Sequence, residues 1–392
     1  MPTNDYTSKL LEMEDAIIEN LYTTDTEVHI HFHLERRPHA CPYCGAVTDK
    51  VHDYRTSILK DLPIMGKSTF LHYKKRRYHC DCCNKHFYES FNYLPKQSRI
   101  MTRLALYALS ILNNKQSVTA TANMLNISNS SVFRFLKNVS YTKPKHLPEV
   151  LSIDEFRGNS GGQKFHAILT DAKKHKLFDI LPTRSQTDLM LYFQSFKDRK
   201  NVKYFIMDMN RVYQDLAIDY FPNATIVIDK FHVVRYVTWA VENVRKRVQK
   251  QMHPSKRKYF KRSRLLLLTH KNKLNSESLL ALEVMLRQSE DLAIAYYLKE
   301  LFYEFMSSHT RAEAGKKLEQ FIIAAQLSNL SEFNACLTML SNWSKYILNC
   351  FECPYTNGYT EGTNNAIKVI KRNAFGFRNF KNFRNRIFIA LT

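Results

Sequence analysis

Three acidic residues have the types and settings that metal-dependent phosphoryl transfer requires. Asp154 and Asp208 each follow a short apolar run typical of a buried strand, and Glu361 opens a basic stretch with helical spacing. Carboxylate oxygens are the ligands that Mg²⁺ prefers, and two such ions about 3.5–4 Å apart can activate an attacking oxygen and stabilise a leaving one. We therefore predict that Asp154, Asp208 and Glu361 are catalytic and hold two Mg²⁺ per active site, which Mn²⁺ can replace.

Other acids compete for the middle position of this set. Asp229 also ends an apolar run, and it precedes His232 by three residues, so both side chains could approach the site at a strand-to-helix turn. Taken singly, an Asp after a strand is more often a turn former or a helix cap. We predict Asp208 as the second ligand from its strand position, and a supporting role for Asp229 and His232. Glu155 points away from Asp154 in a regular strand.

The order of elements in residues 150–232 would bring the two aspartates together. Strands are expected at 150–156, 164–170, 176–181, 202–207 and 224–228, and helices at 187–196 and 212–220. Three strands followed by helix-strand-helix-strand predict an α/β fold with a ribonuclease H-like catalytic core, whose first and fourth strands lie side by side. Residues 233–355 show only helical spacing and are expected to form an all-α insertion. Residues 356–392 would be the C-terminal helix of the core, carrying Glu361.

Two cysteine pairs in residues 38–92 predict a zinc-ribbon-like module. Cys41 and Cys44 flank Pro-Tyr, and Cys80 and Cys83 form a second pair. Four thiolates in two such knuckles match the tetrahedral ligand set of structural zinc, so we expect one structural Zn²⁺. Cys82 is a spare that could replace Cys80 only in a tighter knuckle. Before this module, residues 1–37 are expected to hold a helix at 8–21 and an edge-like strand at 27–34.

Residues 93–140 are helical in pattern and fit a helix-turn-helix domain, followed by a linker at 141–149. Ala122 falls where two helices would cross closely, and Asn126 where the turn needs a left-handed residue. The second helix would present a polar face to DNA, formed by Asn129, Ser130, Arg134 and Lys137. An ordinary helical hairpin is the alternative. After Glu361, the residues expected to contact DNA are Asn364, Lys368, Lys371 and Arg372.

The charge distribution favours a polyanionic partner. The net charge is +22, and residues 233–273 contain thirteen Lys and Arg against one acid, while residues 362–392 contain seven against none. Such runs bind phosphates with release of counterions, so nucleic acid is the expected partner. The helix-turn-helix beside the zinc-ribbon-like module favours double-stranded DNA. No signal peptide or membrane span is expected, so we expect a cytoplasmic, nucleoid-associated protein. Five of the eight cysteines lie between Cys41 and Cys83, which suits metal binding in a reducing compartment better than a disulfide framework.

These motifs together resemble the DDE transposases of the ISL-three family of bacterial insertion sequences. The resemblance rests on Cys-Pro-Tyr-Cys-Gly, Arg-Arg-Tyr-His-Cys-Asp-Cys-Cys, Ser-Ile-Asp-Glu-Phe, Ile-Asp-Lys-Phe-His-Val and Glu-Gly-Thr-Asn-Asn-Ala-Ile-Lys. It implies an enzyme that binds terminal inverted repeats, cleaves the element ends and joins the freed 3′-hydroxyls to target DNA, as a homodimer or higher assembly. It also implies an Asp-x-x-His signature, matched by Asp229 and His232.

Two other classes of function stay open at this point. A non-catalytic zinc and helix-turn-helix regulator would explain residues 38–140 but not the acid-bearing sheet or Glu361. A plain ribonuclease H-like nuclease would explain the acids but not the DNA-binding modules before them. An inactive transposase copy is a further alternative, because the chain ends soon after Glu361.

Overall fold

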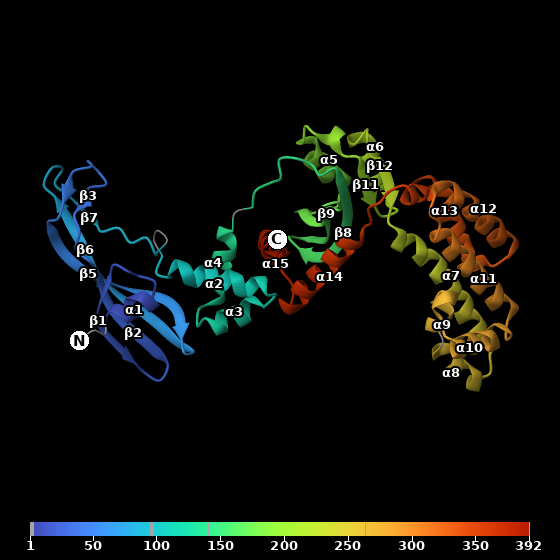
Figure 1. Cartoon of the computed structure of the whole chain (residues 1–392), viewed down its shortest axis with the longest axis horizontal. Coiled ribbons are helices and arrows are strands. Elements are labelled where there is room, and N and C mark those ends of the chain that lie inside the picture. Colours follow the sequence, from blue (N-terminus) through green and yellow to red (C-terminus); the bar gives the residue numbers. More distant parts are fainter. Residues whose placement is uncertain (1–3, 95–97, 140, 263, 392) are drawn as a thin grey trace. The chain divides into compact units, whose positions relative to one another are not determined.

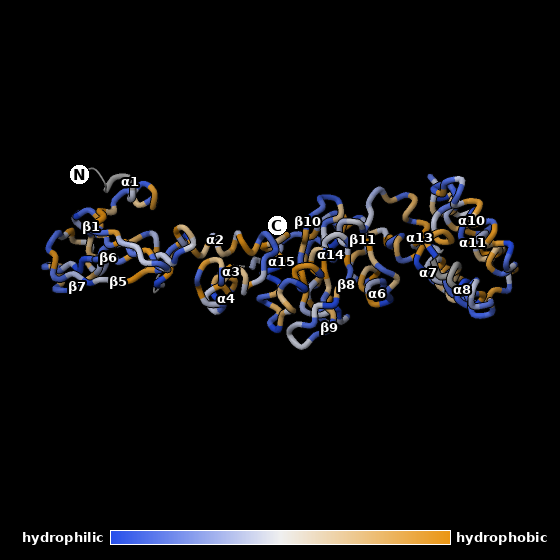
Figure 2. Tube along the Cα trace, turned by 90° about the horizontal axis from the view of Figure 1, so that it is seen from below, coloured by the Kyte–Doolittle hydropathy of each residue, from blue (hydrophilic) through white to orange (hydrophobic). Residues whose placement is uncertain are grey.

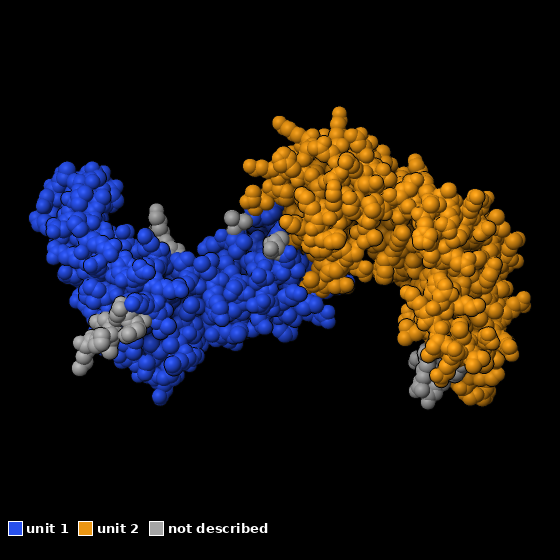
Figure 3. Space-filling model, in the orientation of Figure 1, with its two compact units in different colours: residues 1–141, 367–392 blue, residues 142–366 orange. Residues whose placement is uncertain are grey.

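The chain forms two compact units in the computed structural model, which describes residues 4–94, 98–139, 141–262 and 264–391. The first unit contains Met1–Tyr141 and Ile367–Thr392, and the second contains Thr142–Ala366 (Figure 3). We expected residues 356–392 to belong as a whole to the catalytic core, whereas the structure divides this segment between the units. Among the described helices, none is long and apolar enough to cross a membrane.

A five-stranded sheet occupies the N-terminal part of the first unit. Its strands are β1 (Ala16–Thr23), β2 (Glu27–Leu34), β5 (Val51–Ile64), β6 (Lys67–Cys80) and β7 (Lys85–Tyr88), in the order β1-β2-β6-β5 with β7 also paired to β6. The alternation predicted for β2 is confirmed, since every second residue from Val28 to Leu34 is buried. A small hairpin of β3 (His39–Ala40) and β4 (Val47–Thr48) accompanies the first cysteine pair.

Two expectations about this sheet were wrong. β2 is not an edge strand, because β1 pairs with one side of it and β6 with the other. The helix expected at 8–21 is only α1 (Asn4–Leu10), because residues 16–23 instead pair with β2. That pairing satisfies their backbone hydrogen bonds and places Ala16 and Ile18 in the apolar core.

Four helices complete the first unit. They are α2 (Thr102–Asn113), α3 (Val118–Met124), α4 (Asn129–Asn138) and α15 (Phe380–Leu391). Ser117 and Ser128 cap the N-termini of α3 and α4 by accepting hydrogen bonds from backbone amides in the first turn. The left-handed conformation predicted at Asn126 is confirmed, with a φ of 52°. Ala122 is buried between the helices, as expected.

The end of the chain is part of this helical group. Asn385 donates a hydrogen bond of 2.9 Å to the carbonyl of Leu136, at the C-terminal end of α4. Arg386 donates one of 3.0 Å to the carbonyl of Gln116, just before α3. These bonds join α15 to the C-terminal end of α4 and to the segment before α3. Residues separated by some 250 positions therefore form one packed group.

The second unit is built on a sheet with the strand order β10-β9-β8-β11-β12. The strands are β8 (Val150–Ser160), β9 (Gln163–Asp171), β10 (Lys176–Leu181), β11 (Tyr204–Met207) and β12 (Thr225–Ile228). β9 is antiparallel to its neighbours, whereas β8, β11 and β12 run parallel. All five predicted strands are present, and the predicted contact between the first and fourth strands is confirmed.

Helices and loops cover both faces of this sheet (Figure 1). α5 (Gln186–Gln194) and α6 (Arg211–Tyr220) pack on the face that contains Leu151, Ile153 and Phe205. The other face contains Val150, Ile206 and Val227 and is covered by residues 350–355. α14 (Gly358–Asn373) begins on that second face, and the boundary between the two units falls within this helix.

Between β12 and α14, all regular secondary structure of the described residues is helical, as predicted for residues 233–355. It contains α7 (Lys230–Gln251), α8 (Pro254–Arg262), α9 (Arg264–Leu268), α10 (Ser276–Leu286), α11 (Glu290–Met306), α12 (Arg311–Leu327) and α13 (Asn334–Leu348), with short 3₁₀ turns between some of them. Hydrophobic and hydrophilic stretches alternate along these helices (Figure 2). Their buried faces continue the apolar core that underlies α5 and α6.

Candidate active site

A row of three aspartates crosses the parallel part of the sheet. Ser152 pairs with Ile206, and Met207 pairs with Ile228, so continuing the same register places Asp154, Asp208 and Asp229 in one row. Residues in register on adjacent strands point to the same face, with strands about 4.8 Å apart. Asp154 lies inside β8 and not at its end as expected, because β8 continues as a hairpin with β9 after β11 has ended.

Asp154 is the most confined of the three carboxylates. Its side chain accepts hydrogen bonds of 2.7 Å from the backbone amide of Glu155 and 2.7 Å from Nδ2 of Asn364. Burial, and then the nearby charge of Asp208, raises the pKa of Asp154 to about 7. A carboxylate whose ionised form is this unfavourable gains from a cation placed beside it.

His232 connects the other two aspartates. Its Nδ1 lies 3.0 Å from Oδ1 of Asp208 and 3.2 Å from Oδ2 of Asp229, and these carboxylates raise the pKa of His232 to about 10. Only the contact with Asp229 has hydrogen-bond geometry. The buried Oδ1 of Asp208 is therefore left without a hydrogen-bond donor among the described residues.

Asp229 also accepts hydrogen bonds that stabilise the elements around the row. Its Oδ1 accepts from the amide of Phe231 at 3.1 Å and so caps the N-terminus of α7. Its Oδ2 accepts from Asn357 at 3.2 Å. Burial opposes ionisation of Asp229, but the hydrogen bonds from His232, Asn357 and the Phe231 amide outweigh it and lower its pKa.

The first turns of α14 pack directly on this row. Asn364 contacts Asp154, Thr360 donates a hydrogen bond of 3.1 Å to Ser152, and Asn357 contacts Asp229. Glu361 follows Asn357 by four residues and precedes Asn364 by three, so it shares their side of the helix. Its side chain is exposed.

The arrangement fits divalent metal ions bound by oxygen. Ligand atoms of Asp208, Asp229 and His232 lie within 4.8 Å of one another. The buried Oδ1 of Asp208, which has no hydrogen-bond partner among the described residues, is an atom that a cation could bind. Asp154 lies in register on the neighbouring strand but is outside this close group of three, and so is Glu361. Two carboxylates and an imidazole at this spacing could hold a divalent cation.

The residues predicted to lie around the site differ in their contacts and exposure. Glu155 points to the opposite face, where it contacts Tyr213 of α6, as expected from strand alternation. Asn364, for which we predict a DNA contact, is only 6% exposed and donates a hydrogen bond to Asp154. Lys368 and Arg372 are exposed on α14, and Lys371 is half-buried.

Sequence reasoning missed Asn357, Thr360 and Ser152, which join α14 to the sheet. Ser152 precedes Asp154 by two residues and therefore lies on the same face, so strand alternation could have indicated it. Asn357 lies four residues before Glu361, and Thr360 lies one residue before it. Only the packing of this segment shows that both side chains face the sheet.

The cysteine quartet, defined as Cys41, Cys44, Cys80 and Cys83, gathers in the first unit. Sγ of Cys41 lies 3.6 Å from Sγ of Cys83, and Sγ of Cys44 lies 3.5 Å from Sγ of Cys80. Tetrahedral zinc with bonds of about 2.3 Å separates its sulfurs by about 3.8 Å, so the quartet has the size of a zinc site. Cys82 is exposed and outside this group, which agrees with its prediction as a spare.

One of these thiols is prepared for ionisation. Desolvation opposes ionisation of the Cys41 thiol. Hydrogen bonds from the backbone amides of Tyr43 and Cys44 outweigh this effect and lower the pKa of Cys41 to about 7. Burial, and then the hydrogen bond to Cys41, raises the pKa of Cys83 to about 12. Metal binding requires thiolates, so a bound cation would favour the ionised form of both Cys41 and Cys83.

Comparison with known proteins finds matches for the regions that contain the carboxylate row and the cysteine quartet. Residues 151–387 match a family described as transposase, the ISL3-type DDE transposases, and residues 37–83 match a family described as the zinc-finger of transposase IS204/IS1001/IS1096/IS1165. The chain is 28% identical over 352 residues to the transposase for insertion sequence element IS1001 of Bordetella parapertussis, covering 88% of this chain and 86% of that protein. A match of 55 residues, 49% identical, to a Lactococcus lactis subsp. lactis protein named ATP-dependent protease covers 13% of this chain and 18% of that protein, too little for a functional argument.

A sheet with a row of carboxylates, joined to a cysteine module of zinc-ribbon type, is the architecture of an enzyme that cleaves and joins DNA with the help of metal ions. The transposase match covers more than half of the chain. The chain belongs to the ISL3 family of insertion-sequence transposases, which are DDE enzymes.

Proposed function

We propose that the chain binds the terminal inverted repeats of its insertion sequence, cleaves the element ends and joins the freed 3′-hydroxyls to target DNA, with Asp154, Asp208 and Glu361 as the catalytic residues. The observation that carries this proposal is the cross-strand row of carboxylates, onto which α14 packs with Glu361 in its first turns. We expect the transposase to act as a homodimer or a higher assembly on DNA.

The strand order supports a ribonuclease H-like core. Three strands in sequence, the second antiparallel, are followed by two parallel strands added beside the first, which gives the order β10-β9-β8-β11-β12. This order brings residues from the first and fourth strands together at the centre of the sheet, where a two-ion site needs them.

In the proposed mechanism each protein group has a separate task. Two Mg²⁺, when bound, would activate the attacking water or 3′-hydroxyl and stabilise the charge on the leaving oxygen. Asp154 and Asp208 would hold them from adjacent strands, and Glu361 would complete the ligand set from α14. Asn364 keeps the carboxylate of Asp154 in orientation, and His232 supplies positive charge to Asp208 and fixes Asp229.

The choice of Asp208 over Asp229 leads to a direct prediction. Asp208→Asn is expected to abolish end cleavage, because it removes the charge of a carboxylate whose buried Oδ1 has no hydrogen-bond partner among the described residues and would be available to a metal ion. Asp229→Asn is expected to retain measurable cleavage, since an asparagine oxygen can still cap α7. The two purified variants would be compared in a cleavage assay on a duplex that carries the element end. Full cleavage by Asp208→Asn together with none by Asp229→Asn would reverse the assignment.

We also propose that α3 and α4 form a helix-turn-helix that binds DNA through the exposed face of α4. The capped helices, the left-handed Asn126 and the exposed Arg134 and Lys137 support this. Arg134→Ala and Lys137→Ala should each weaken DNA binding by a few-fold and reduce its salt dependence by about one phosphate contact. Fluorescence anisotropy titrations at several salt concentrations would measure this. Lys174→Ala, an exposed lysine in the second unit, serves as the control, and an unchanged salt slope for the α4 variants would count against the proposal.

The experiment that tests the whole proposal is end cleavage with Mg²⁺ and with Ca²⁺. We expect nicking or double-strand cleavage at the element end with Mg²⁺, and binding without cleavage with Ca²⁺, whose flexible coordination supports binding better than the chemical step. Binding without cleavage under both conditions would favour a non-catalytic DNA-binding regulator or an inactive copy.

A further inference from the structure

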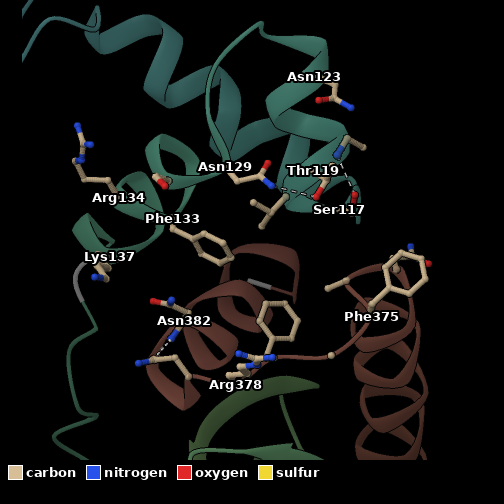
Figure 4. Close-up of a pocket in the computed structure, with 18 residues that line it drawn as sticks. Ser117, Thr119, Asn123, Asn129, Phe133, Arg134, Lys137, Phe375, Arg378 and Asn382 are labelled. Carbon is tan, nitrogen blue, oxygen red and sulfur yellow. Dashed lines mark hydrogen bonds between the residues drawn. The ribbon is translucent and has the colours of Figure 1, made fainter.

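A cavity of about 930 Å³ lies within the first unit, between α3 and α4 on one side and the segment joining α14 to α15 on the other (Figure 4). One wall contains the polar face of α4, from Asn129 to Lys137, which we propose binds DNA. The other wall is formed by residues 373–379 and Asn382. The end of the chain therefore completes a site whose first half comes from the helix-turn-helix.

The lining of this cavity suits a nucleic acid. Its three cations are Arg134, Lys137 and Arg378, and no acidic residue is among the described residues that line it. None of the three cations forms an ion pair with a described carboxylate. The remaining polar side chains are mostly asparagines, which can both donate to and accept from the edges of bases. Phe133 extends from α4 into the same space (Figure 4).

Phe375 is the unusual residue of the second wall. Its side chain is 100% exposed, and its backbone is left-handed with a φ of 52°. The amide of Phe375 donates to the carbonyl of Arg372 at 3.0 Å, and that of Gly376 to Lys371 at 3.0 Å, which is the double bond pattern that ends a helix with a left-handed residue. Glycine is the residue preferred at that position, because a side chain costs about 1 kcal/mol or more there.

Neither the backbone nor the packing of the free protein explains a phenylalanine at this position. Glycine would relieve the strain, and a polar side chain would avoid exposing an aromatic ring to water. The neighbouring Phe377, by contrast, is buried and stacks on Phe383 with ring centres 4.6 Å apart. An exposed ring that lines the same cavity as cations is a combination that single-stranded nucleic-acid sites use, with stacking on a base and ion pairing to phosphates.

We propose that this cavity binds an unpaired DNA base, which stacks on Phe375 while Arg378 and the α4 cations contact the adjoining phosphates. The proposal rests on the proposed binding of duplex DNA by α4, and it adds the preferred substrate: a duplex with an unpaired base beside the bound segment. The cavity is large enough for a nucleotide, since sites for ligands of this size measure about 300–1,000 Å³. The ring would be covered by DNA and not by a second copy of the chain, because three unpaired cations and no acid line the cavity.

The test uses two fluorescent probes, a fully paired duplex and the same duplex with a short single-stranded 3′ extension. The full-length protein is expected to bind the extended duplex more tightly. Phe375→Gly should lower the affinity for the extended duplex by about ten-fold, to that of the paired duplex, since stacking on an aromatic side chain contributes on this scale. Phe375→Tyr should retain the preference. Leu106→Ala removes another exposed apolar side chain of the same unit and should change neither affinity.

Thermal melting separates this effect from misfolding, because Phe375→Gly relieves a left-handed strain and should melt at the same temperature as the parent protein or higher. An unchanged preference in Phe375→Gly would refute the stacking site while leaving the helix-turn-helix proposal intact if Arg134→Ala still weakens both probes. Absence of binding to either probe by the folded parent protein would refute both. A shift of Phe375→Gly from dimer to monomer in light scattering without DNA would show that a second copy covers the ring.

Discussion

Replacing Asp154 by asparagine is expected to reduce end cleavage by about a thousand-fold or more while leaving DNA binding unchanged. The substitution keeps the shape of a side chain that is only 8% exposed, but it removes the negative charge that would bind a metal ion. Stabilisation of transition-state charge by bound metal contributes several kcal/mol, and each factor of ten in rate corresponds to about 1.4 kcal/mol. Glu361→Gln should have a comparable effect, because it removes the ligand contributed by α14.

The same variants should be as stable as the parent protein when no metal is present. Asp154 is buried near the like charges of Asp208 and Asp229, and a neutral side chain removes this repulsion. Melting curves in the presence of a chelator would show this, and cleavage and anisotropy assays would give the other two quantities. Asp219→Asn, on the exposed end of α6, is the matched control. Cleavage by Asp154→Asn at the parent rate would contradict the assignment of the catalytic row.

Loss of the cysteine quartet is expected to have the largest effect on stability. Cys44→Ser should reduce zinc content from one ion per chain to none and make residues 37–83 sensitive to protease. Structural zinc in small modules contributes about 10–16 kcal/mol of apparent binding free energy, and its loss therefore unfolds the module that it holds. The sheet of the second unit contains none of these ligands and should keep its secondary structure.

Cys82→Ser provides the control for this experiment within the same knuckle. Cys82 is exposed and outside the quartet, so its substitution should leave zinc content and protease resistance unchanged. Native mass spectrometry of reduced protein would count the bound ions. A folded and reduced parent protein without zinc, or loss of zinc in Cys82→Ser alone, would show that the ligand set is wrong.

Much of the catalytic sheet could be predicted from local sequence. The runs before Asp154, Asp208 and Asp229 are short, apolar and bounded by polar turns. The spacing of apolar residues therefore predicted these strands and the succession of strands and helices along the chain. The turn at Asn126 was predictable for a similar reason, because few residues tolerate a left-handed backbone. Residues 8–21 were misassigned because their apolar spacing also suits a helix, and only pairing with β2 decides between the two.

What the sequence alone determined about this transposase is the set of chemical groups: the carboxylates, the cysteine quartet and the basic helices. Their types and short-range spacing depend on neighbouring residues and can be recognised locally. Tertiary structure decided which groups meet. The alignment of Asp154, Asp208 and Asp229 depends on strand register, and the contact of Asn364 with Asp154 depends on how α14 packs. The cavity beside Phe375 needs two segments that are far apart in the sequence, residues 117–137 and 373–382. Each of these depends on pairings between distant segments, whose energies come from long-range contacts that no local pattern contains.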